Sequence, residues 1–339
     1  MFRGLTRAMS ATPTIITHSG KFHCDEALAV GLLRLLPAYS SSTLIRTRDP
    51  AVIATGDVVV DVGGVYDPSA HRYDHHQRGF DTTLSEEHST KLSSAGLVYK
   101  HFGKDVIATL AADLGPEDTE LVYDKIYTSF VEAIDAIDNG IPRFSRDAVP
   151  AYADNKTDLG SRISHLNPRW NQDVDDQGVA QRFEAAVALA TEAFVGKVES
   201  LVHSWIPARD LVAGALEKAG EIDPSGEIFF LETMCPWKGH LKDYEAAHGI
   251  DGKLKYALFA DSGGMWRIMA VPVQPDSFES RLKLPEAWRG VRDADLDAVT
   301  GEGVPQGAKF VHASGFIGGH ETYEGVLAMA RVSLQQSAQ

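Results

Sequence analysis

The chain has 339 residues, of which 44% are hydrophobic and 23% charged, and it carries a formal net charge of −15. The length suggests about two domains, and the charge argues against a protein that coats nucleic acid electrostatically, although not against an enzyme that acts on a polyanion. The lack of an apolar run of about 18 residues argues against a membrane span. Cys24 and Cys235 form no CxxC pair, so neither a disulfide framework nor a zinc ribbon is expected, and a reducing compartment fits.

The first half of the chain alternates strand and helix patterns after an N-terminus whose first ten residues hold two arginines and no acid. That composition fits either a short mitochondrial presequence or an ordinary terminus. Ile15 and Ile16 lead into His18 as a short strand, and residues 57–61 form a second strand that ends at Asp61. The expected helices are residues 25–36, 90–102 and 118–138. This order predicts an α/β fold, a parallel sheet flanked by helices, with ligand sites at the carboxyl ends of its strands.

The second half shows a different pattern. Residues 145–175 are polar and read as connecting structure, and residues 177–204 predict a long amphipathic helix. Short apolar runs then indicate the antiparallel strands of a smaller α+β lobe, at residues 227–231, 256–260, 265–271 and 309–312. Gly318 and Gly319 read as a glycine turn before the last helix. The predicted organisation is a metal-binding catalytic domain over residues 12–175, a connecting helix over 176–205, and a substrate-binding lobe over 206–335.

Four short segments concentrate histidine and aspartate, and each follows or ends an apolar run. They are His18-Ser-Gly-Lys-Phe-His23-Cys-Asp25-Glu26, Asp61-Val-Gly-Gly64, Tyr73-Asp74-His75-His76 and Asp135-Ala-Ile-Asp138-Asn-Gly140. Mixed imidazole and carboxylate ligands suit manganese, iron, cobalt or zinc, whereas calcium prefers oxygen ligands. The surplus of acids suggests two metals that share a carboxylate and activate a water. Each segment alone also has an ordinary interpretation, as a structural histidine, a strand-to-turn element or helix-surface charges.

The order and wording of these segments resemble the N-terminal motifs of the DHH phosphoesterase superfamily. One branch is closer, because Thr-His-Ser-Gly-Lys-Phe-His-Cys-Asp-Glu, Tyr-Asp-His-His-Gln-Arg-Gly-Phe, Lys-Leu-Ser-Ser-Ala-Gly-Leu-Val-Tyr and His-Ala-Ser-Gly-Phe-Ile-Gly-Gly-His resemble the melanocyte-proliferating-gene-one (Myg-one) family. The matching stretches run from about residue 15 to residue 331, nearly the whole chain.

The resemblance implies six metal ligands, which are His18, His23, Asp25, Asp61, His75 and Asp138. Asp61 would bridge the two metals, and Asp135 is the rival of Asp138 for the last ligand. In the first motif four residues separate His18 from His23, and His23 stands where many relatives carry an aspartate. This departure leaves the identity of the metal and the role of His18 open.

The resemblance also implies roles in catalysis and substrate binding. His76 would face the substrate phosphate and Asp74 would orient a histidine, so the expected catalytic residues are Asp61, Asp74, His75 and His76. In the C-terminal lobe, Gly318, Gly319 and His320 resemble the glycine-rich signature of the DHH-associated domain, where backbone amides approach a phosphate. Arg267, Arg281 and Lys283 are candidates for contacts with phosphate, and they could equally be surface charges. Trp237, Trp266 and Phe316 are candidates for stacking on bases, and they could equally be core residues.

The residues therefore predict a metal-dependent phosphodiester hydrolase with its active site between the two lobes. The family resemblance implies a 3'-5' exonuclease that acts on single-stranded RNA, in mitochondria, the nucleus or both, and a cytoplasmic location stays open. Two divalent metals are expected as cofactors, manganese first, with magnesium, cobalt and zinc as alternatives. No membrane partner is expected.

Two alternative functions stay open. One is a phosphohydrolase for small substrates such as pyrophosphate, cyclic dinucleotides or short oligonucleotides. The other is a metal-stabilised scaffold or binding protein without catalysis. The sequence also leaves open the preference for RNA or DNA, the direction of digestion and the oligomeric state, for which a dimer is one option.

Overall fold

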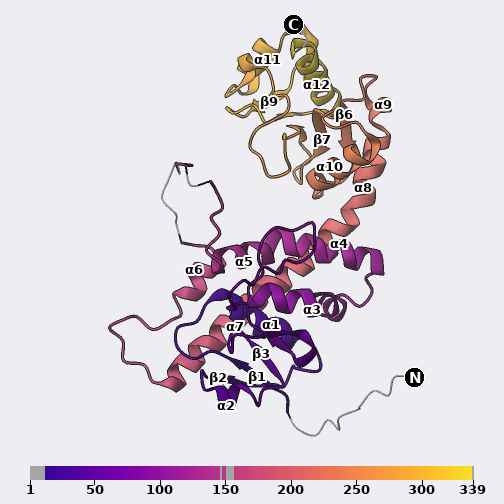
Figure 1. Cartoon of the computed structure of the whole chain (residues 1–339). Coiled ribbons are helices and arrows are strands. Elements are labelled where there is room, and N and C mark those ends of the chain that lie inside the picture. Colours follow the sequence, from indigo (N-terminus) through magenta and orange to yellow (C-terminus); the bar gives the residue numbers. More distant parts are fainter. Residues whose placement is uncertain (1–11, 146, 150–155, 338–339) are drawn as a thin grey trace, which may run out of the picture. The chain divides into compact units, whose positions relative to one another are not determined.

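The computed structural model describes residues 12–145, 147–149 and 156–337 (Figure 1). The chain divides into two compact units, Met1–Val202 and His203–Gln339. The arginine-containing N-terminal segment considered above as a presequence lies outside the described residues. The three domain ranges expected from the sequence, residues 12–175, 176–205 and 206–335, stay predictions.

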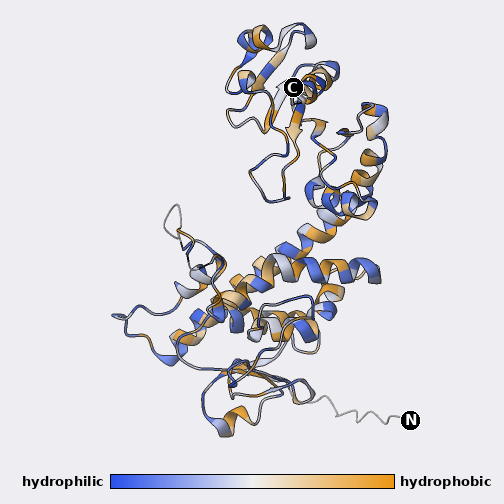
Figure 2. Ribbon diagram, turned by 45° about the horizontal axis from the view of Figure 1, so that its top comes forward, coloured by the Kyte–Doolittle hydropathy of each residue, from blue (hydrophilic) through white to orange (hydrophobic). Residues whose placement is uncertain are grey.

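The first unit is built on a five-stranded sheet with the order β2-β1-β3-β5-β4. Its strands are β1 (Thr14–Thr17), β2 (Thr43–Arg46), β3 (Val58–Val60), β4 (Tyr66–Asp67) and β5 (Arg72–Tyr73). The pairs β1–β2, β1–β3 and β3–β5 are parallel, and only the short edge strand β4 runs antiparallel to its neighbour. Figure 2 colours the central strands as hydrophobic, consistent with a sheet that is covered on both faces.

Helices cover this sheet and carry much of the core of the first unit. They are α1 (Cys24–Leu35), α2 (Pro50–Ile53), α3 (Ser94–Leu110), α4 (Pro116–Ile126), α5 (Glu132–Asp138), α6 (Leu159–Ser164) and α7 (Asp176–Ser200). On one face of the sheet, Ile16 and Val59 pack near Val52 and Ile53 of α2. Helix α1 packs against α3 and α7, and nearly its whole length is buried. The expected α/β fold of this half is confirmed.

The start of α1 shows how the sequence defines a helix beginning at the site. The Glu26 carboxylate accepts hydrogen bonds from the backbone N–H of His23, at 2.9 and 3.0 Å. Asp25 and Glu26 place negative charge in the first turn and Arg34 places positive charge in the last turn, both favourable with the helix dipole. Asp25 is thereby fixed at the amino end of a buried helix.

Two expectations for the first unit need correction. The strands β2, β4 and β5 were missed. The helix expected over residues 118–138 is interrupted, because a π-helical turn over Tyr127–Val131 separates α4 from α5. A π turn shifts the residues that follow by one position around the helix axis, so the face that α5 presents could not be read from the periodicity of α4.

The second unit contains another five-stranded sheet, with the order β6-β7-β8-β10-β9. Its strands are β6 (Ile228–Leu231), β7 (Tyr256–Ala260), β8 (Trp266–Ala270), β9 (Ala308–Val311) and β10 (Ile317–His320), and its helices are α8 (Ile206–Glu217), α9 (Ala219–Ile222), α10 (Trp237–His248), α11 (Asp293–Thr300) and α12 (Tyr323–Ser337). Only β6 and β7 pair in parallel. The smaller α+β lobe with a largely antiparallel sheet is confirmed.

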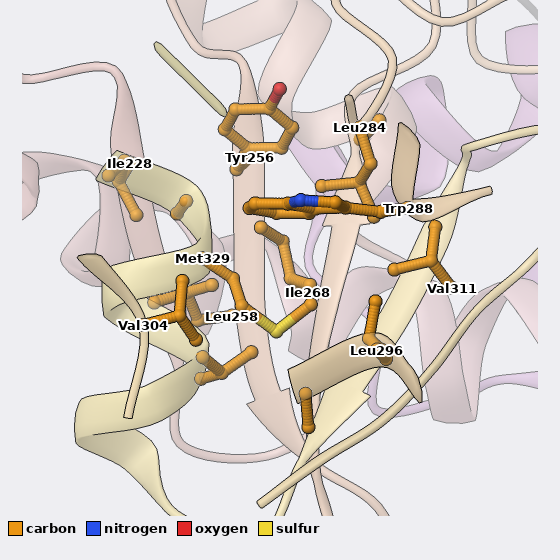
Figure 3. Close-up of a cluster of buried hydrophobic side chains, with 14 residues drawn as sticks. Ile228, Tyr256, Leu258, Ile268, Leu284, Trp288, Leu296, Val304, Val311 and Met329 are labelled. Carbon is orange, nitrogen blue, oxygen red and sulfur yellow. The ribbon is translucent and has the colours of Figure 1, made fainter. Parts of the chain in front are cut away.

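The core of this second sheet corrects the expected glycine turn. Gly318 and Gly319 are central residues of β10, paired with Ile268 and Arg267 of β8, so the interpretation as a turn was wrong. Figure 3 shows the neighbouring cluster, in which the indole of Trp288 lies among buried aliphatic and aromatic side chains of the sheet and α12. No helix in the described part of the chain is both long and apolar enough to cross a membrane.

Candidate metal centre

Three neighbouring parallel strands of the first sheet end in the predicted chemistry. His18 follows β1, Asp61 follows β3 and Asp74 follows β5, and these strands lie side by side in the order β1-β3-β5. Because parallel strands share a carboxyl edge, the three segments meet at one rim of the sheet. The beginning of α1 adds Asp25, and the end of α5 adds Asp138.

A cavity of about 1220 Å³ opens at this rim, wholly within the first unit. It is lined by residues of all four predicted segments and by further residues of the loops and of α6. The predicted members are His18, His23, Asp25, Asp61, Asp74, His75, His76 and Asp138; cations are added by Arg48, Lys91 and Lys156. The structure therefore brings together all eight of these residues, which are spread over 121 positions of the chain.

Asp61 lies at the centre of the cluster. Its Oδ2 is 3.4 Å from Nε2 of His18, and its Oδ1 is 3.4 Å from Nε2 of His75 and 3.5 Å from Nδ1 of His76. Its backbone has a φ of 57°, the left-handed region that aspartate tolerates better than most residues. The carboxylate is nearly buried. Its two oxygens approach different histidines, His18 and His75, as the oxygens of a bridging ligand would approach two metal sites.

Two buried histidines, His18 and His75, flank Asp61 and are called the basal histidines below. Nε2 of His18 lies 2.9 Å from Oε1 of Glu26, and Nε2 of His75 lies 3.1 Å from Oδ2 of Asp138. Each basal histidine therefore stands between Asp61 and a second carboxylate. This places two histidine–carboxylate groups on either side of one shared aspartate.

Several of these buried atoms approach one another without forming hydrogen bonds. Nε2 of His75, Oδ1 of Asp61 and Oδ1 of Asp25 have no hydrogen-bond partner among the described residues. Unsatisfied buried polar atoms are rare and costly in folded proteins, and lone pairs that converge without bonding are what a metal ion requires. The residues present therefore fit a metal centre.

The donor atoms fall into overlapping groups whose members lie within 4.8 Å of one another. These groups are His18-His23-Glu26, Asp61-His75-His76, His23-Asp25-Asp138 and Asp25-Glu26-Asp61. His23, Asp25, Glu26 and Asp61 each belong to two groups, and this sharing is suited to two neighbouring cations. Nitrogen and oxygen donors together favour borderline metals of the first transition row.

The electrostatics of the pocket point the same way. Burial lowers the pKa of His18, but hydrogen bonds to Asp61 and Glu26 outweigh it and raise the pKa to about 10. For His75, the contacts with Asp138 and Asp61 likewise overcome burial and raise the pKa to about 10. Burial and the neighbouring carboxylates raise the pKa of Asp25 well above its usual value. The two histidine shifts share one cause, which is that the carboxylates of the pocket attract positive charge.

Asp135 and Asp138 take different positions. Asp135 is fully buried, and its Oδ1 accepts hydrogen bonds from the backbone N–H of Ser93, the hydroxyl of Ser93 and the backbone N–H of Gly96, at 2.9, 2.7 and 3.0 Å. It therefore ties α5 to the start of α3. Asp138 lines the cavity and approaches His75. The geometry favours Asp138 over Asp135 as a ligand.

His76 combines exposure with a fixed orientation. Asp74 is buried; its Oδ1 lies 2.7 Å from Nδ1 of His76, and its Oδ2 accepts the backbone N–H of Gly64 at 2.6 Å. The His76 side chain is 61% exposed, so its ring is accessible while Asp74 holds one nitrogen. The roles expected for the two residues, orientation by Asp74 and contact with the substrate by His76, stay predictions.

Some residues of the site were not singled out from the sequence. Glu26 is fully buried and contacts His18, yet from the sequence it was only part of the first motif. Ser94, at the first position of α3, donates a hydrogen bond of 2.7 Å to Oδ2 of Asp25. The spacing of Glu26 three residues after His23 was the available signal for a capping role, but not for the contact with His18.

Of the residues expected to bind substrate in the second unit, Gly318, Gly319 and His320 of β10 lie beside Arg267 of β8, whereas Arg281 lies beyond the end of β8, where its backbone N–H donates to the carbonyl of Val271. His320 is buried; its Nε2 lies 3.0 Å from the carbonyl of Pro305, and its Nδ1 accepts the backbone N–H of Thr322 at 3.0 Å. Arg267 pairs with Asp261 at 2.5 Å, and Arg281 pairs with buried Glu245 at 2.7 Å. The ring nitrogens of His320 and both guanidinium groups therefore already have partners within the chain.

Comparison with known proteins gives consistent similarities along the chain. The family model described as "Uncharacterised protein family (UPF0160)", with the short name MYG1_exonuc, matches residues 14–334. The protein named MYG1 exonuclease from Homo sapiens is 49% identical over 97% of this chain and 87% of its own length. The Bos taurus protein of the same name is 48% identical over 97% and 86%. The protein named MYG1 protein from Dictyostelium discoideum is 46% identical over 96% and 97%.

Proposed function

The chain belongs to the MYG1 exonuclease family, and from this premise we propose that it is a metal-dependent phosphodiester hydrolase that degrades RNA from the 3' end. The observation that carries the proposal is the meeting of the basal histidines, Asp61 and Asp25 in one cavity, with buried donor atoms that lack hydrogen-bond partners. The mammalian relatives are named exonucleases, which supports a nucleic acid as the substrate.

The proposed ligands divide around Asp61. His18, His23 and Glu26 would hold one divalent cation. Asp25 and Asp138, which share a donor group, would hold the other with His75, which lies 3.1 Å from Asp138. Asp61 would be shared between the two cations. When bound, such a pair supplies Lewis-acid polarisation of a phosphate oxygen and a water of lowered pKa. Manganese is the proposed metal, since the donor set mixes imidazole nitrogen with carboxylate oxygen.

The protein's own groups contribute the remaining chemistry. Asp74 holds Nδ1 of His76, which leaves the other ring nitrogen to meet the substrate. Arg48 and Lys91 line the same cavity and offer positive charge to phosphate oxygens. Ser94 fixes the Asp25 carboxylate through Oδ2 and leaves Oδ1 for a ligand role.

The size of the cavity bears on the competing hydrolase functions. A volume of about 1220 Å³ lies above the usual range for drug-sized ligands, roughly 300–1,000 Å³. A pyrophosphate or a single dinucleotide would leave much of this space unfilled. The volume therefore favours a chain substrate whose terminal nucleotides enter the pocket.

The test uses the full-length protein with manganese and a single-stranded RNA labelled at its 5' end. We expect a ladder that shortens from the 3' end with the wild type, and none with Asp61→Asn. The matched control is Asp105→Asn, which makes the same change at an exposed position outside the cavity. A 3'-labelled copy should release its label as the first product, and single-stranded DNA run in parallel measures the sugar preference.

The alternatives have distinct outcomes in the same preparation. Manganese binding by electron paramagnetic resonance without hydrolysis of RNA, pyrophosphate or dinucleotides would replace the proposal by the metal-stabilised scaffold. Hydrolysis of only the small substrates would replace it by the small-substrate hydrolase. Digestion that begins at the 5' end would overturn the proposed direction.

We also propose a mitochondrial and nuclear location, supported by the family resemblance. Microscopy of the chain with a C-terminal fluorescent tag tests it. A signal confined to the cytoplasm would contradict it.

A further inference from the structure

The second unit contains a separate cavity, and among the residues predicted to bind substrate only Arg281 and Trp237 line it. Its volume is about 410 Å³, within the range of small-molecule sites. Its walls come from the first half of α10, from the segment before β7 and from the loop after β8. These contribute Trp237, Lys238, Leu241 and Lys242, then Asp251, Gly252 and Lys255, and then residues 271–275, with Arg281 completing the wall.

The cavity is positively charged, in contrast to the chain as a whole. Lys238, Lys242, Lys255 and Arg281 line it, and Asp251 is the single acid among the lining residues. Behind the wall, buried Glu245 pairs with Arg281 at 2.7 Å. After this pairing two positive charges remain in excess, within a chain whose formal net charge is −15. Such a local concentration of cations would attract an anion.

Hydrogen-bond donors without a partner also belong to residues that line the cavity. Helix α10 begins at Trp237 and Lys238, and no side chain caps its N-terminus, where Pro236 is the N-cap residue. Helix N-termini favour anions, because their first backbone N–H groups lack partners within the helix. In addition, the indole N–H of Trp237 is buried and has no hydrogen-bond partner among the described residues, although Trp237 lines the cavity and is only 1% exposed.

The remaining wall is apolar. Leu241, Val271, Pro272 and Pro275 line the cavity beside the cations. A phosphate alone would use the charged side, whereas a phosphate with an attached organic group of nucleotide size would use both. From the charge, the free donors, the volume and the apolar wall we infer that this cavity binds the phosphate group of a nucleotide.

This site is distinct from the metal centre and from the glycine segment of β10. All its lining residues lie between positions 237 and 281, in the second unit. Gly319 pairs with Arg267 near the start of β8, whereas the cavity lies at residues 271–275, beyond the end of that strand. The inference goes beyond the proposed hydrolysis and does not depend on it.

The test measures ligand binding to the full-length protein in chelator, so that hydrolysis plays no part. Inorganic phosphate, adenosine 5'-monophosphate and a single-stranded RNA are titrated separately by calorimetry. The variant carries Lys238→Gln and Lys242→Gln, two exposed positions whose change should leave the fold intact. The matched control carries Lys197→Gln and Lys218→Gln, the same change of charge outside the cavity.

We expect the two cavity substitutions to weaken binding at least about tenfold, because charge-assisted hydrogen bonds to phosphate are lost, and the control to match the wild type. Weakened binding of inorganic phosphate and the mononucleotide supports a free nucleotide as the source of the phosphate. Weakened binding of RNA alone supports a strand contact by the same phosphate chemistry. Equal affinities of wild type and cavity variant for all three ligands, or no saturable binding by the wild type, would overturn the inference.

A second measurement reports directly on the buried donor. The chain has five tryptophans, whose indole N–H resonances can be resolved after nitrogen-15 labelling, with Trp237→Phe assigning the resonance in question. Phosphate should shift the Trp237 resonance in the wild type and the control, and not in the cavity variant. A shift that persists in the cavity variant would place the anion elsewhere and overturn the inference.

Discussion

Alanine at position 135 should destabilise the first unit while leaving its metal affinity largely intact, and alanine at position 138 should do the reverse. The Asp135 carboxylate is fully buried and accepts three hydrogen bonds from Ser93 and Gly96. Its removal leaves three donors without an acceptor inside the protein. Each buried unsatisfied group costs about 1–3 kcal/mol, so the loss should reach about 3 kcal/mol even at the lower figure.

This loss can be measured as a change of melting temperature. For a unit of this size, 1 kcal/mol corresponds to roughly 2–4 °C, so Asp135→Ala should lower the Tm of the first unit by about 6–12 °C. Asp138 is 19% exposed, and its described contact is with His75. Asp138→Ala should therefore shift the Tm by less than about 2 °C, while weakening manganese binding at least about tenfold.

Thermal unfolding followed by circular dichroism in chelator gives the first quantity, and electron paramagnetic resonance of manganese gives the second. The two substitutions serve as controls for each other, since both remove a carboxylate from α5. The reasoning would be refuted by an Asp135→Ala protein with unchanged Tm and lost manganese binding, because Asp135 would then be the ligand and the hydrogen bonds to Ser93 and Gly96 incidental.

Three further results are expected. Because the pKa values of the basal histidines are raised, a bound metal must displace their protons. Manganese affinity should therefore rise about tenfold to a hundredfold per pH unit from about pH 7 to about pH 9, with matching proton release in calorimetry. An affinity that does not change with pH would contradict this. Arg281→Gln should destabilise the second unit by about 3 kcal/mol in urea unfolding, since it leaves the 1% exposed Glu245 carboxylate without its cation, and unchanged stability would show that the pair is dispensable. Gly325→Ala should cost about 1–3 kcal/mol by the same assay, because the new Cβ would lie 2.0 Å from a ring carbon of buried His320; a neutral effect would mean that the ring can move aside.

The main elements of the site followed from the sequence because strand ends are easy to recognise. An apolar run that stops at a histidine or an aspartate, as at His18 and Asp61, marks both a buried strand and the rim where ligands bind. The choice between Asp135 and Asp138 could not be derived in the same way, because residues three apart lie on the same face of a helix. That choice depends on the start of α3, which brings Ser93 and Gly96 to Asp135.

The missed strands also have physical reasons. Strand β2 lies at the edge of its sheet and is partly exposed, so Leu44 and Ile45 alone gave no clear alternation. Gly318 and Gly319 suggested a turn because glycine weakens isolated strands. In the fold, a Cβ at Gly319 would lie 2.3 Å from a guanidinium nitrogen of Arg267. Glycine is needed there because of residues distant in sequence, which no local pattern shows.

The left-handed backbone of Asp61 restricts which amino acids this position can accept during divergence. Two independent requirements act on it, a conformation with φ of 57° and a carboxylate between the basal histidines. Only glycine, asparagine and aspartate enter that conformation with ease, and of these only aspartate supplies the charge. Family members that have abandoned hydrolysis should therefore carry asparagine or glycine at this position far more often than glutamate or alanine, so that the loss of the chemistry can be read from a single column of an alignment.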